Sequence, residues 1–401
     1  MRVNLLFSEY LINKFTAILT DMRSRLSILL LLFGSLSAGY VVPKPPGKYN
    51  VTLTTGTLID YARDDPFSAT PTPRTLMLSV FQPAACESTI LVPYMPNKTA
   101  EFQGAFLQRQ FNISGDLTSL FLEAQLPVCQ DHPKDCSSLD DGPILLLSPG
   151  YGIPRLYYNV IASAIASVGF TVIAIDHPGD ANIITYPDGH AVYNNGPSSP
   201  TPDEYLRYIS PRAADASFII DQLSNSTAMA ELLPRRGPRQ FLTDRVAMLG
   251  HSLGGASAVV AAAQDPRIRG AINWDGSFFG SVPLSGLFQP VLYMSEANVT
   301  DPSWVTLWPQ LKGPKLWIEV ANTTHQSFSD APTLLQAVGQ NTPALAELLG
   351  TIVPAKLMEI MVAYTKDWMN GAFMGKVGGP LLGGLEPDRF PEVSTVTKSN
   401  F

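Results

Sequence analysis

The chain has 401 residues, which is enough for one large domain or two ordinary ones and for a sizeable core. Charged residues make up 15% of it and the net charge is −7, with no run of Lys and Arg longer than two, so nucleic acid is excluded as an expected partner. The 30 glycines and 34 prolines follow no period, which excludes a fibrous protein and predicts many turns and long loops.

The N-terminal segment has the layout of a secretory signal peptide. A basic region at residues 22–25 precedes an apolar run at 26–33 and small residues at 34–38. The run is too short for a transmembrane span, which needs about 20 apolar residues. We therefore expect residues 1–38 to be a leader and the protein to be secreted. Because acidic residues precede the basic region, Met22 is a candidate for the true start.

Sequons and cysteines fit an exported chain. Candidate glycan acceptors are Asn50, Asn97, Asn112, Asn225, Asn298 and Asn322. Glycans there would offset the low charge at the surface. The three cysteines, Cys86, Cys129 and Cys136, are too few for a disulfide scaffold and wrongly spaced for zinc. A bridge between Cys129 and Cys136 is the simplest pairing, with Cys86 left over or exchanged into it, and three buried thiols are the alternative.

The elements after Pro143 alternate between short apolar runs and helical stretches. Residues 41–75 look loop-rich, 75–81 form a strand, and 82–142 look irregular. Further strands are expected at 144–147, 171–175, 246–249, 271–274, 291–294 and 316–320, and helices at 156–168, 212–223, 254–263 and 348–369. This alternation predicts an α/β fold with a mostly parallel sheet covered by helices on both faces. Ligands in such sheets bind beyond the carboxyl ends of the strands.

The expected strand 246–249 runs into the sequence GHSLGG at residues 250–255. The pattern G-x-S-x-G between a strand and a helix is the nucleophile elbow of α/β-hydrolases. Ser252 would stand on a strained turn with its hydroxyl above the sheet, and small residues at 250 and 254 would let the helix fold back. Residues 39–401 are therefore expected to form a single α/β-hydrolase domain.

A serine nucleophile needs a base, and the chain has five histidines. In this fold the order is serine, acid, histidine, so the base must come late in the chain. His325 follows the last expected strand, whereas His251 adjoins the serine and the remaining three precede it. The acid must lie between Ser252 and His325 near a strand end. Candidates are Asp275, Glu296 and Asp301, and the pattern alone does not choose among them.

Several segments together resemble the secreted platelet-activating factor acetylhydrolase family. They are residues 250–255, 274–279 (WDGSFF) and 325–330 (HQSFSD), with residues 147–152 (LSPGYG) similar to the family's oxyanion loop and residues 81–83 and 92–97 similar to its N-terminal sheet region. The likeness runs from about residue 47 to about residue 365. It implies Ser252 as nucleophile, His325 as general base and Asp275 as the orienting acid.

The resemblance also implies an oxyanion hole made by the backbone amides of Tyr151 and Leu253. Two departures concern this region: Pro149 stands where the family usually has histidine, and Leu253 stands where an aromatic residue is common. The proline stiffens the loop that carries the Tyr151 amide, and Leu253 should reshape the acyl pocket. Both leave the three catalytic candidates in place and bear on substrate preference.

The family implies hydrolysis of the sn-2 short-chain or oxidised acyl ester of a glycerophospholipid, through an acyl-enzyme and without calcium, other metals or cofactors. No carboxylate cluster has calcium-loop spacing. No partner protein is implied. The alternatives are a broader secreted carboxylesterase or polyester-cleaving lipase on the same fold, and a catalytically inactive hydrolase domain used for binding.

Two segments could shape access to the site. The loop at 186–205 is rich in proline and glycine and long enough to cover it. Apolar residues at 103–126 could face lipid aggregates, although core packing is the favoured interpretation there. Core packing is also favoured for the apolar face of the helix expected at 348–369.

Overall fold

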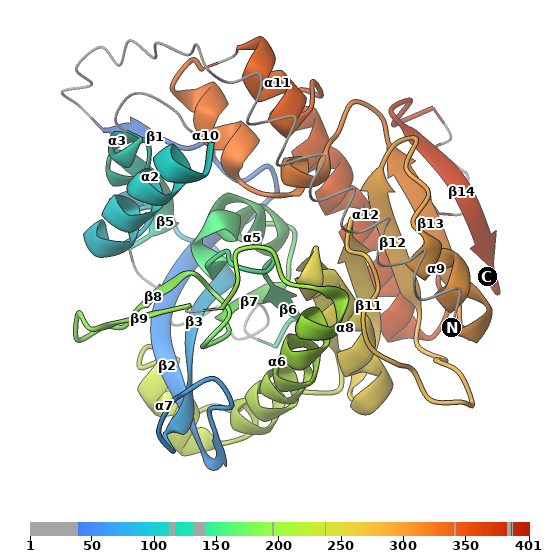
Figure 1. The fold of residues 1–401 in the computed structure, drawn as a ribbon, viewed down its shortest axis with the longest axis horizontal. Helices are drawn as coiled ribbons and strands as arrows, with labels where there is room; N and C mark the ends of the chain where they lie inside the picture. Colours follow the sequence, from blue (N-terminus) through green and yellow to red (C-terminus); the bar gives the residue numbers. More distant parts are fainter. Residues whose placement is uncertain are drawn as a thin grey trace.

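The computed structural model describes residues 39–111, 117–130, 141–194, 196–236, 238–340, 342–382, 386 and 388–401. The expected leader, the sequon at Asn112 and the cysteine at position 136 lie outside these residues. The described strands and helices form one layered molecule around a large sheet (Figure 1).

Nine strands make up the large sheet. They are β2 (Asn50–Asp64), β3 (Pro73–Ala84), β6 (Ile144–Ser148), β7 (Thr171–Asp176), β10 (Val246–His251), β11 (Ile268–Trp274), β12 (Val291–Glu296), β13 (Lys315–Val320) and β14 (Val393–Ser399). Their spatial order is β14-β13-β12-β11-β10-β6-β7-β3-β2. The six strands from β13 to β7 are parallel, while β14 and β3 run antiparallel to their neighbours.

Ten described helices surround the sheet: α2 (Asn97–Phe111), α3 (Thr118–Leu122), α5 (Asn159–Ala166), α6 (Pro202–Leu223), α7 (Ser226–Leu232), α8 (Leu253–Gln264), α9 (Pro302–Leu307), α10 (Ala331–Ala337), α11 (Pro343–Leu349) and α12 (Pro354–Met374). Two small sheets complete the fold. One contains β1 (Tyr40–Val41), β5 (Ala124–Cys129) and β4 (Thr89–Pro93), and the other pairs β8 (Ile183–Thr185) with β9 (Ala191–Tyr193).

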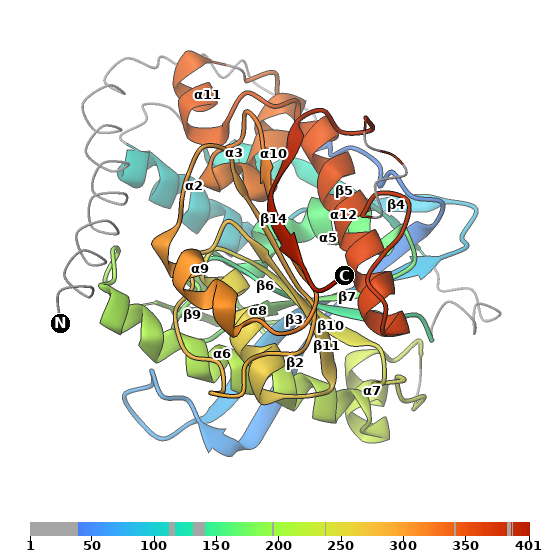
Figure 2. The ribbon, with the colours of Figure 1, turned by 90° about the vertical axis from the view of Figure 1, so that its right-hand side faces the viewer.

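Alternate residues of each central strand enter two separate cores. In β6, Leu145 and Leu147 pack with α5 and α12, whereas Ile144 and Leu146 pack with α6 and α8. The period of two follows from strand geometry, and burial on both faces explains why these strands are continuous apolar runs. Figure 2 shows α6 and α12 on opposite sides of the strands. The predicted α/β class with helices on both faces is confirmed.

The strands expected after Pro143 are all present, and α8 matches its prediction. Helix α6 begins at Pro202 instead of residue 212, because Thr201 and Glu204 form a capping box and the helix continues through Pro211. Burial of Tyr205, Tyr208 and Ile209 offsets the cost of that internal proline. The expected loop at 186–205 was therefore too long: it contains β9 and the first turn of α6.

Strands β2 and β14 were missed, and residues 82–142 are more ordered than expected. Strand β2 occupies 15 residues of the region predicted to be loops, and α2, α3, β4 and β5 occupy much of the following one. Within 103–126, Leu120 and Phe121 are buried and Leu107 packs against the core, so core packing holds for these side chains. The C-terminal helix α12 starts at Pro354, after Gly350, and ends before Gly375.

The disulfide joins Cys86 to Cys129, so the pairing of Cys129 with Cys136 was wrong. Strand β4 runs antiparallel to β5 with Thr89 opposite Cys129, which brings Cys86 beside the end of β5. The bridge links residues 43 positions apart and ties the β3–β4 connection to the small sheet. The pairing of β4 with β5 determines which cysteines form the disulfide, and the spacing of the cysteines in the sequence does not show this pairing.

None of the described helices is both long enough and apolar enough to cross a membrane. Helix α12, with 21 residues, carries charged side chains along its length, among them Lys356, Glu359 and Asp367.

Candidate active site

Ser252 occupies a strained turn between β10 and α8. Its backbone has φ 56° and ψ −125°, a conformation that costs a non-glycine residue about 1–3 kcal/mol. The turn leaves no room for a Cβ atom at position 250 or at position 254. A Cβ at position 250 would lie 2.1 Å from the carbonyl carbon of Gly254, and one at position 254 would lie 2.0 Å from the oxygen of Ser148. The G-x-S-x-G spacing is thus required by the close approach of β10, α8 and the end of β6.

Ser252, His325 and Asp275 lie on one line of hydrogen bonds. The Oγ of Ser252 is 3.0 Å from Nε2 of His325, and Nδ1 of His325 is 2.6 Å from Oδ2 of Asp275. Asp275 is 4% exposed and its other oxygen accepts the backbone N–H of Glu296 at 3.0 Å. A carboxylate on Nδ1 leaves the lone pair of Nε2 facing the serine hydroxyl, which is the arrangement that can take a proton from it.

The rival acids have other partners. Glu296 presents its backbone N–H to Asp275. Asp301 accepts from the backbone N–H and the hydroxyl of Ser303, at 2.8 and 2.6 Å, and so caps the N-terminus of α9. Strand order explains the choice: β11 adjoins β10 in the sheet, so the residue after β11 is the one that ends beside the elbow.

His325 opens a short 3₁₀ turn (η3, His325–Phe328) that is fastened on both sides. The hydroxyl of Thr324 donates to Leu348 O, and that of Ser327 donates to Leu349 O, both at 2.7 Å. Downstream, Asp330 accepts the backbone N–H groups at the start of α5 and the hydroxyl of Tyr94. Burial raises the pKa of Asp330 to about 7, against the opposing effect of those donors. These contacts hold the imidazole without using its ring nitrogens.

His251 points away from Ser252, as expected, but it has a role that the sequence did not reveal. Its Nε2 donates to the backbone carbonyl of His325 at 2.9 Å, so Nδ1 accepts from the hydroxyl of Tyr158 at 2.8 Å. The same hydroxyl accepts the N–H of Gly150 at 3.2 Å. Burial, with His325 as a second cause, lowers the pKa of His251 to about 3, so the ring is neutral and can serve as both donor and acceptor.

The other described histidines lie outside this cluster. His177 is buried, with Nε2 2.9 Å from Ser148 Oγ and Nδ1 2.8 Å from Asp215 Oδ2. His190 is exposed and contacts Asp188. The fifth, His132, is outside the described residues.

The segment expected to supply oxyanion donors faces Ser252. A Cβ at position 150 would lie 3.5 Å from the Cβ of Ser252, so the loop passes directly over the serine. The Leu253 amide is the first of α8, and such amides have no acceptor within their own helix. The Leu253 side chain is buried in the core beneath α6 and α8.

Aromatic side chains gather beside this loop. The ring of Tyr151 lies 5.5 Å from Tyr205 and 5.0 Å from Tyr208, and Tyr205 lies 5.0 Å from Phe279. Tyr151 is partly exposed, so the cluster forms an apolar wall beside the elbow that reaches the surface. Such a wall can contact an acyl or alcohol group of an ester.

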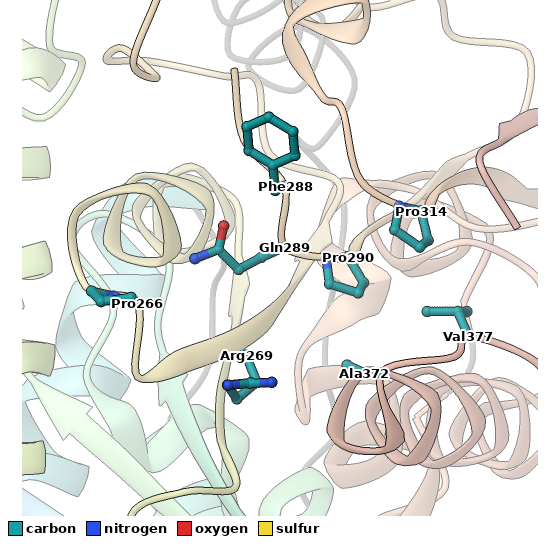
Figure 3. Close-up of a pocket in the computed structure, with 9 residues that line it drawn as sticks. Pro266, Arg269, Phe288, Gln289, Pro290, Pro314, Ala372 and Val377 are labelled. Atoms are coloured by element: carbon teal, nitrogen blue, oxygen red, sulfur yellow. The ribbon is translucent and has the colours of Figure 1, made fainter. Parts of the chain in front are cut away.

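A surface pocket of about 480 Å³ lies at the other end of the strands (Figure 3). Pro290 and Pro314 in its lining directly precede β12 and β13. Asp275 and His325 instead follow the carboxyl ends of β11 and β13, so the pocket is separate from the candidate site. Across the described part of the chain, no group of three or more His, Cys, Asp or Glu side chains could hold a metal ion.

The chain is similar to one protein family and to several named proteins. The family described as platelet-activating factor acetylhydrolase, isoform II, matches residues 36–222 and 239–367. A protein of Arthroderma benhamiae named "probable 1-alkyl-2-acetylglycerophosphocholine esterase" is 30% identical over 90% of this chain and 94% of its own length. The platelet-activating factor acetylhydrolase of Bos taurus is 25% identical over 47% of this chain and 48% of its own length.

Among solved structures, a ferulic acid esterase from Streptomyces cinnamoneus superposes with a TM-score of 0.72 and 27% identity, covering 90% of this chain and all of that one. The α/β-hydrolase fold and the ester hydrolase activity predicted from the sequence are both confirmed. The family match spans most of the chain on both sides of the elbow, and the chain belongs to the platelet-activating factor acetylhydrolase family.

Proposed function

We propose that this protein is a secreted serine esterase that hydrolyses the sn-2 short-chain or oxidised acyl ester of glycerophospholipids, with Ser252, His325 and Asp275 as its catalytic triad. The observation that carries the proposal is the line of hydrogen bonds from Ser252 Oγ through His325 to Asp275, at 3.0 and 2.6 Å, above a strained elbow. A strained backbone conformation costs folding free energy, and such strain is typically retained at functional sites, so it favours a catalytic role for Ser252 over a structural one.

The geometry supports a two-step acyl transfer. Nε2 of His325 takes the proton of Ser252 as Oγ attacks the ester carbonyl, and the negative charge that forms on the carbonyl oxygen is bound by the amides of Tyr151 and Leu253. Collapse breaks the bond to the alcohol oxygen, which receives the proton from His325. Water then attacks the acyl-enzyme by the same route and releases the acid. Asp275 holds the imidazole in the required tautomer and stabilises its charged form.

The phospholipid substrate rests on family membership and on the names of the relatives. A broader carboxylesterase is the second candidate, because Tyr151, Tyr205 and Phe279 line an aromatic wall beside the elbow and the similar solved structure is a ferulic acid esterase. The acyl group of a ferulic acid ester is aromatic, so these rings can stack against it. An acetyl group is too small to need such stacking.

A substrate comparison separates the two candidates. We expect kcat/KM for a 2-acetyl glycerophosphocholine to equal or exceed that for p-nitrophenyl acetate and for methyl ferulate, each measured on the same preparation. A preference of several orders of magnitude for either simple ester would overturn the phospholipid assignment and leave the serine esterase in place. Tyr205→Leu should reduce turnover of methyl ferulate more than that of the phospholipid if the aromatic wall binds rings.

Secretion is supported by the Cys86–Cys129 disulfide, since such bridges persist in oxidising compartments. The side chains of five sequon asparagines, Asn50, Asn97, Asn225, Asn298 and Asn322, are exposed. We expect material secreted by a eukaryotic host to begin near residue 39 and to lose mass on treatment with an N-glycosidase. Secreted chains that retain residues 5–20 would contradict the leader.

A binding module without activity is distinguished by covalent labelling. A fluorophosphonate should modify the folded chain at Ser252, and Ser252→Ala should remove the label. Folded protein that resists the reagent would favour the inactive module.

A further inference from the structure

Arg212 lies beneath the loop that passes over Ser252. It comes from the middle of α6, is 1% exposed, and is not adjacent in sequence to any candidate catalytic residue. Its Nη1 donates to the carbonyl of Pro149 at 2.6 Å and contacts Ser148 Oγ at 3.1 Å, and its Nη2 donates to the carbonyl of Gly150 at 3.3 Å. One guanidinium therefore holds three consecutive residues of this loop.

Asp180 fixes the guanidinium from the opposite side. Both Nε and Nη2 of Arg212 donate to its carboxylate, with the Nη2 contact at 2.7 Å, and Asp180 is itself 1% exposed. The planar guanidinium is bound to Asp180 along one edge and to the loop along another, so it cannot rotate and its N–H groups that face the loop have fixed directions. A lysine at position 212 would keep the positive charge but would lack the planar set of N–H donors.

The direction of these carbonyls sets the direction of the next amides. In a trans peptide the C=O and the N–H of one plane point in opposite directions. The plane between Pro149 and Gly150 obeys this: its carbonyl faces Arg212 and its N–H reaches Tyr158 Oη on the far side. The carbonyl of Gly150 also faces Arg212, so the N–H of Tyr151 leaves the loop on the side away from the guanidinium. A Cβ at position 150 would lie 3.5 Å from Ser252 Cβ and from the His251 ring.

We propose that Arg212, held by Asp180, is a positioning residue that aims the Tyr151 amide into the oxyanion hole. The inference rests on the proposed serine esterase function and adds to it a side chain remote in sequence from all three triad members. Pro149 is compatible with this role, because Arg212 uses its backbone carbonyl, which takes the shortest of the hydrogen bonds from Arg212 to the loop.

The loop is anchored at its start by a second buried chain of hydrogen bonds. Ser148 Oγ accepts from Arg212, so it donates to Nε2 of His177, and Nδ1–H of His177 donates to Asp215. Asp215 is paired with Arg74 through two hydrogen bonds, at 2.7 and 2.8 Å. This chain is 0–2% exposed throughout, which excludes direct contact with a substrate and leaves a structural role.

The test compares Arg212→Met, Arg212→Lys and Lys315→Met with the wild type. Lys315 is the matched control: it is 7% exposed and its ammonium also holds two backbone carbonyls, those of Trp308 and Leu311, but at the far end of β13. Folded protein is quantified by near-ultraviolet circular dichroism. The readouts are kcat and KM for p-nitrophenyl acetate and Ki for a phenylboronic acid, which forms a tetrahedral adduct with the serine.

We expect Arg212→Met to lower kcat per folded chain by about 10²-fold, in line with the loss of one oxyanion donor, with KM changed less than threefold and Ki raised in parallel with the loss of kcat. Arg212→Lys, which keeps the buried charge beside Asp180 and so preserves folding, should lie between Met and wild type. Lys315→Met should retain wild-type kcat and Ki even if it melts at a lower temperature.

Wild-type kcat and Ki in a folded Arg212→Lys or Arg212→Met variant would overturn the proposal, and so would an equal loss of kcat in Lys315→Met. Failure of the proposed function looks different. In that case the wild type itself would neither bind the boronic acid nor take a fluorophosphonate on Ser252.

Discussion

Asp275 and Asp301 have the same side chain and follow neighbouring strands of the sheet, yet they do different work. Asp275 receives the imidazole N–H of His325, and Asp301 receives the backbone of α9. The difference arises from strand order, since β11 adjoins the elbow strand β10 and β12 lies one place further out. The hydrogen-bond partner of each aspartate therefore depends on its position in the sheet as much as on residue type.

Asp275→Asn should lower kcat by about 10⁴-fold with little change in fold, because an amide can no longer hold the imidazole in the tautomer that accepts a proton at Nε2. Asp301→Asn is the matched control. Asparagine caps helices about as well as aspartate, so kcat and the free energy of unfolding should both stay close to wild type. A large loss of kcat in Asp301→Asn with none in Asp275→Asn would reverse the assignment.

His251 should make the protein acid-sensitive. Its pKa is about 3 when folded and about 6.5 when unfolded, so below pH 6.5 the unfolded chain binds a proton that the folded chain refuses. The stabilising effect is complete above pH 6.5 and is lost as the pH falls towards 3. In His251→Gln, the drop in unfolding free energy between pH 6.5 and 4.5 should be smaller than in wild type by about 2 kcal/mol. Urea unfolding at both pH values measures this, and equal drops would contradict it.

Some elements could be predicted from local pattern and others only from tertiary contacts. The parallel strands are apolar runs because both faces are buried, and the elbow has a fixed spacing because its backbone allows no Cβ, so both are visible in the sequence. Strand β2 lies at the edge of the large sheet and has no continuous apolar run, because many of its side chains are exposed or only partly buried, so it resembled a loop. Helix α6 contains Pro211, and its start was displaced for that reason.

The pairing of β4 with β5 brings the two cysteines of the disulfide together. The bridge should stabilise the fold by roughly 2–4 kcal/mol, because it closes a loop of 43 residues in the unfolded chain. Cys86→Ser and Cys129→Ser should each lower the free energy of unfolding by about that amount. Cys136→Ser should not, since its two possible partners are bound to each other. Peptide mapping without reduction should recover the 86–129 pair, and recovery of a 129–136 pair would contradict the structure.

Across the whole molecule, the site depends on contacts between segments that are distant in the chain. Ser252 and Asp275 were accessible to pattern and family resemblance, as was His325. Tyr158 and Arg212 were not, because a hydroxyl or guanidinium that binds a loop carries no motif: Tyr158 lies 93 residues from His251, and Arg212 lies 63 residues from Pro149. The low charge content fits a molecule with two large apolar cores.

The proposed mechanism uses only side chains and backbone amides, so removal of divalent metals should not affect it. We expect dialysis against EDTA, with chelator present in the assay, to leave kcat/KM for p-nitrophenyl acetate and for the 2-acetyl phospholipid within a factor of two. Added calcium should not raise either value. A loss of activity that calcium restores would contradict metal-independent catalysis.

The most direct test of the central claim is to trap the acyl-enzyme. The protein is mixed with a p-nitrophenyl ester, quenched in acid within milliseconds to seconds, and analysed by intact mass and peptide mapping. We predict one acyl group per chain, on the peptide that contains Ser252, and none in Ser252→Ala. An active wild type that carries the acyl group elsewhere, or a Ser252→Ala variant that turns over at the wild-type rate, would contradict the account.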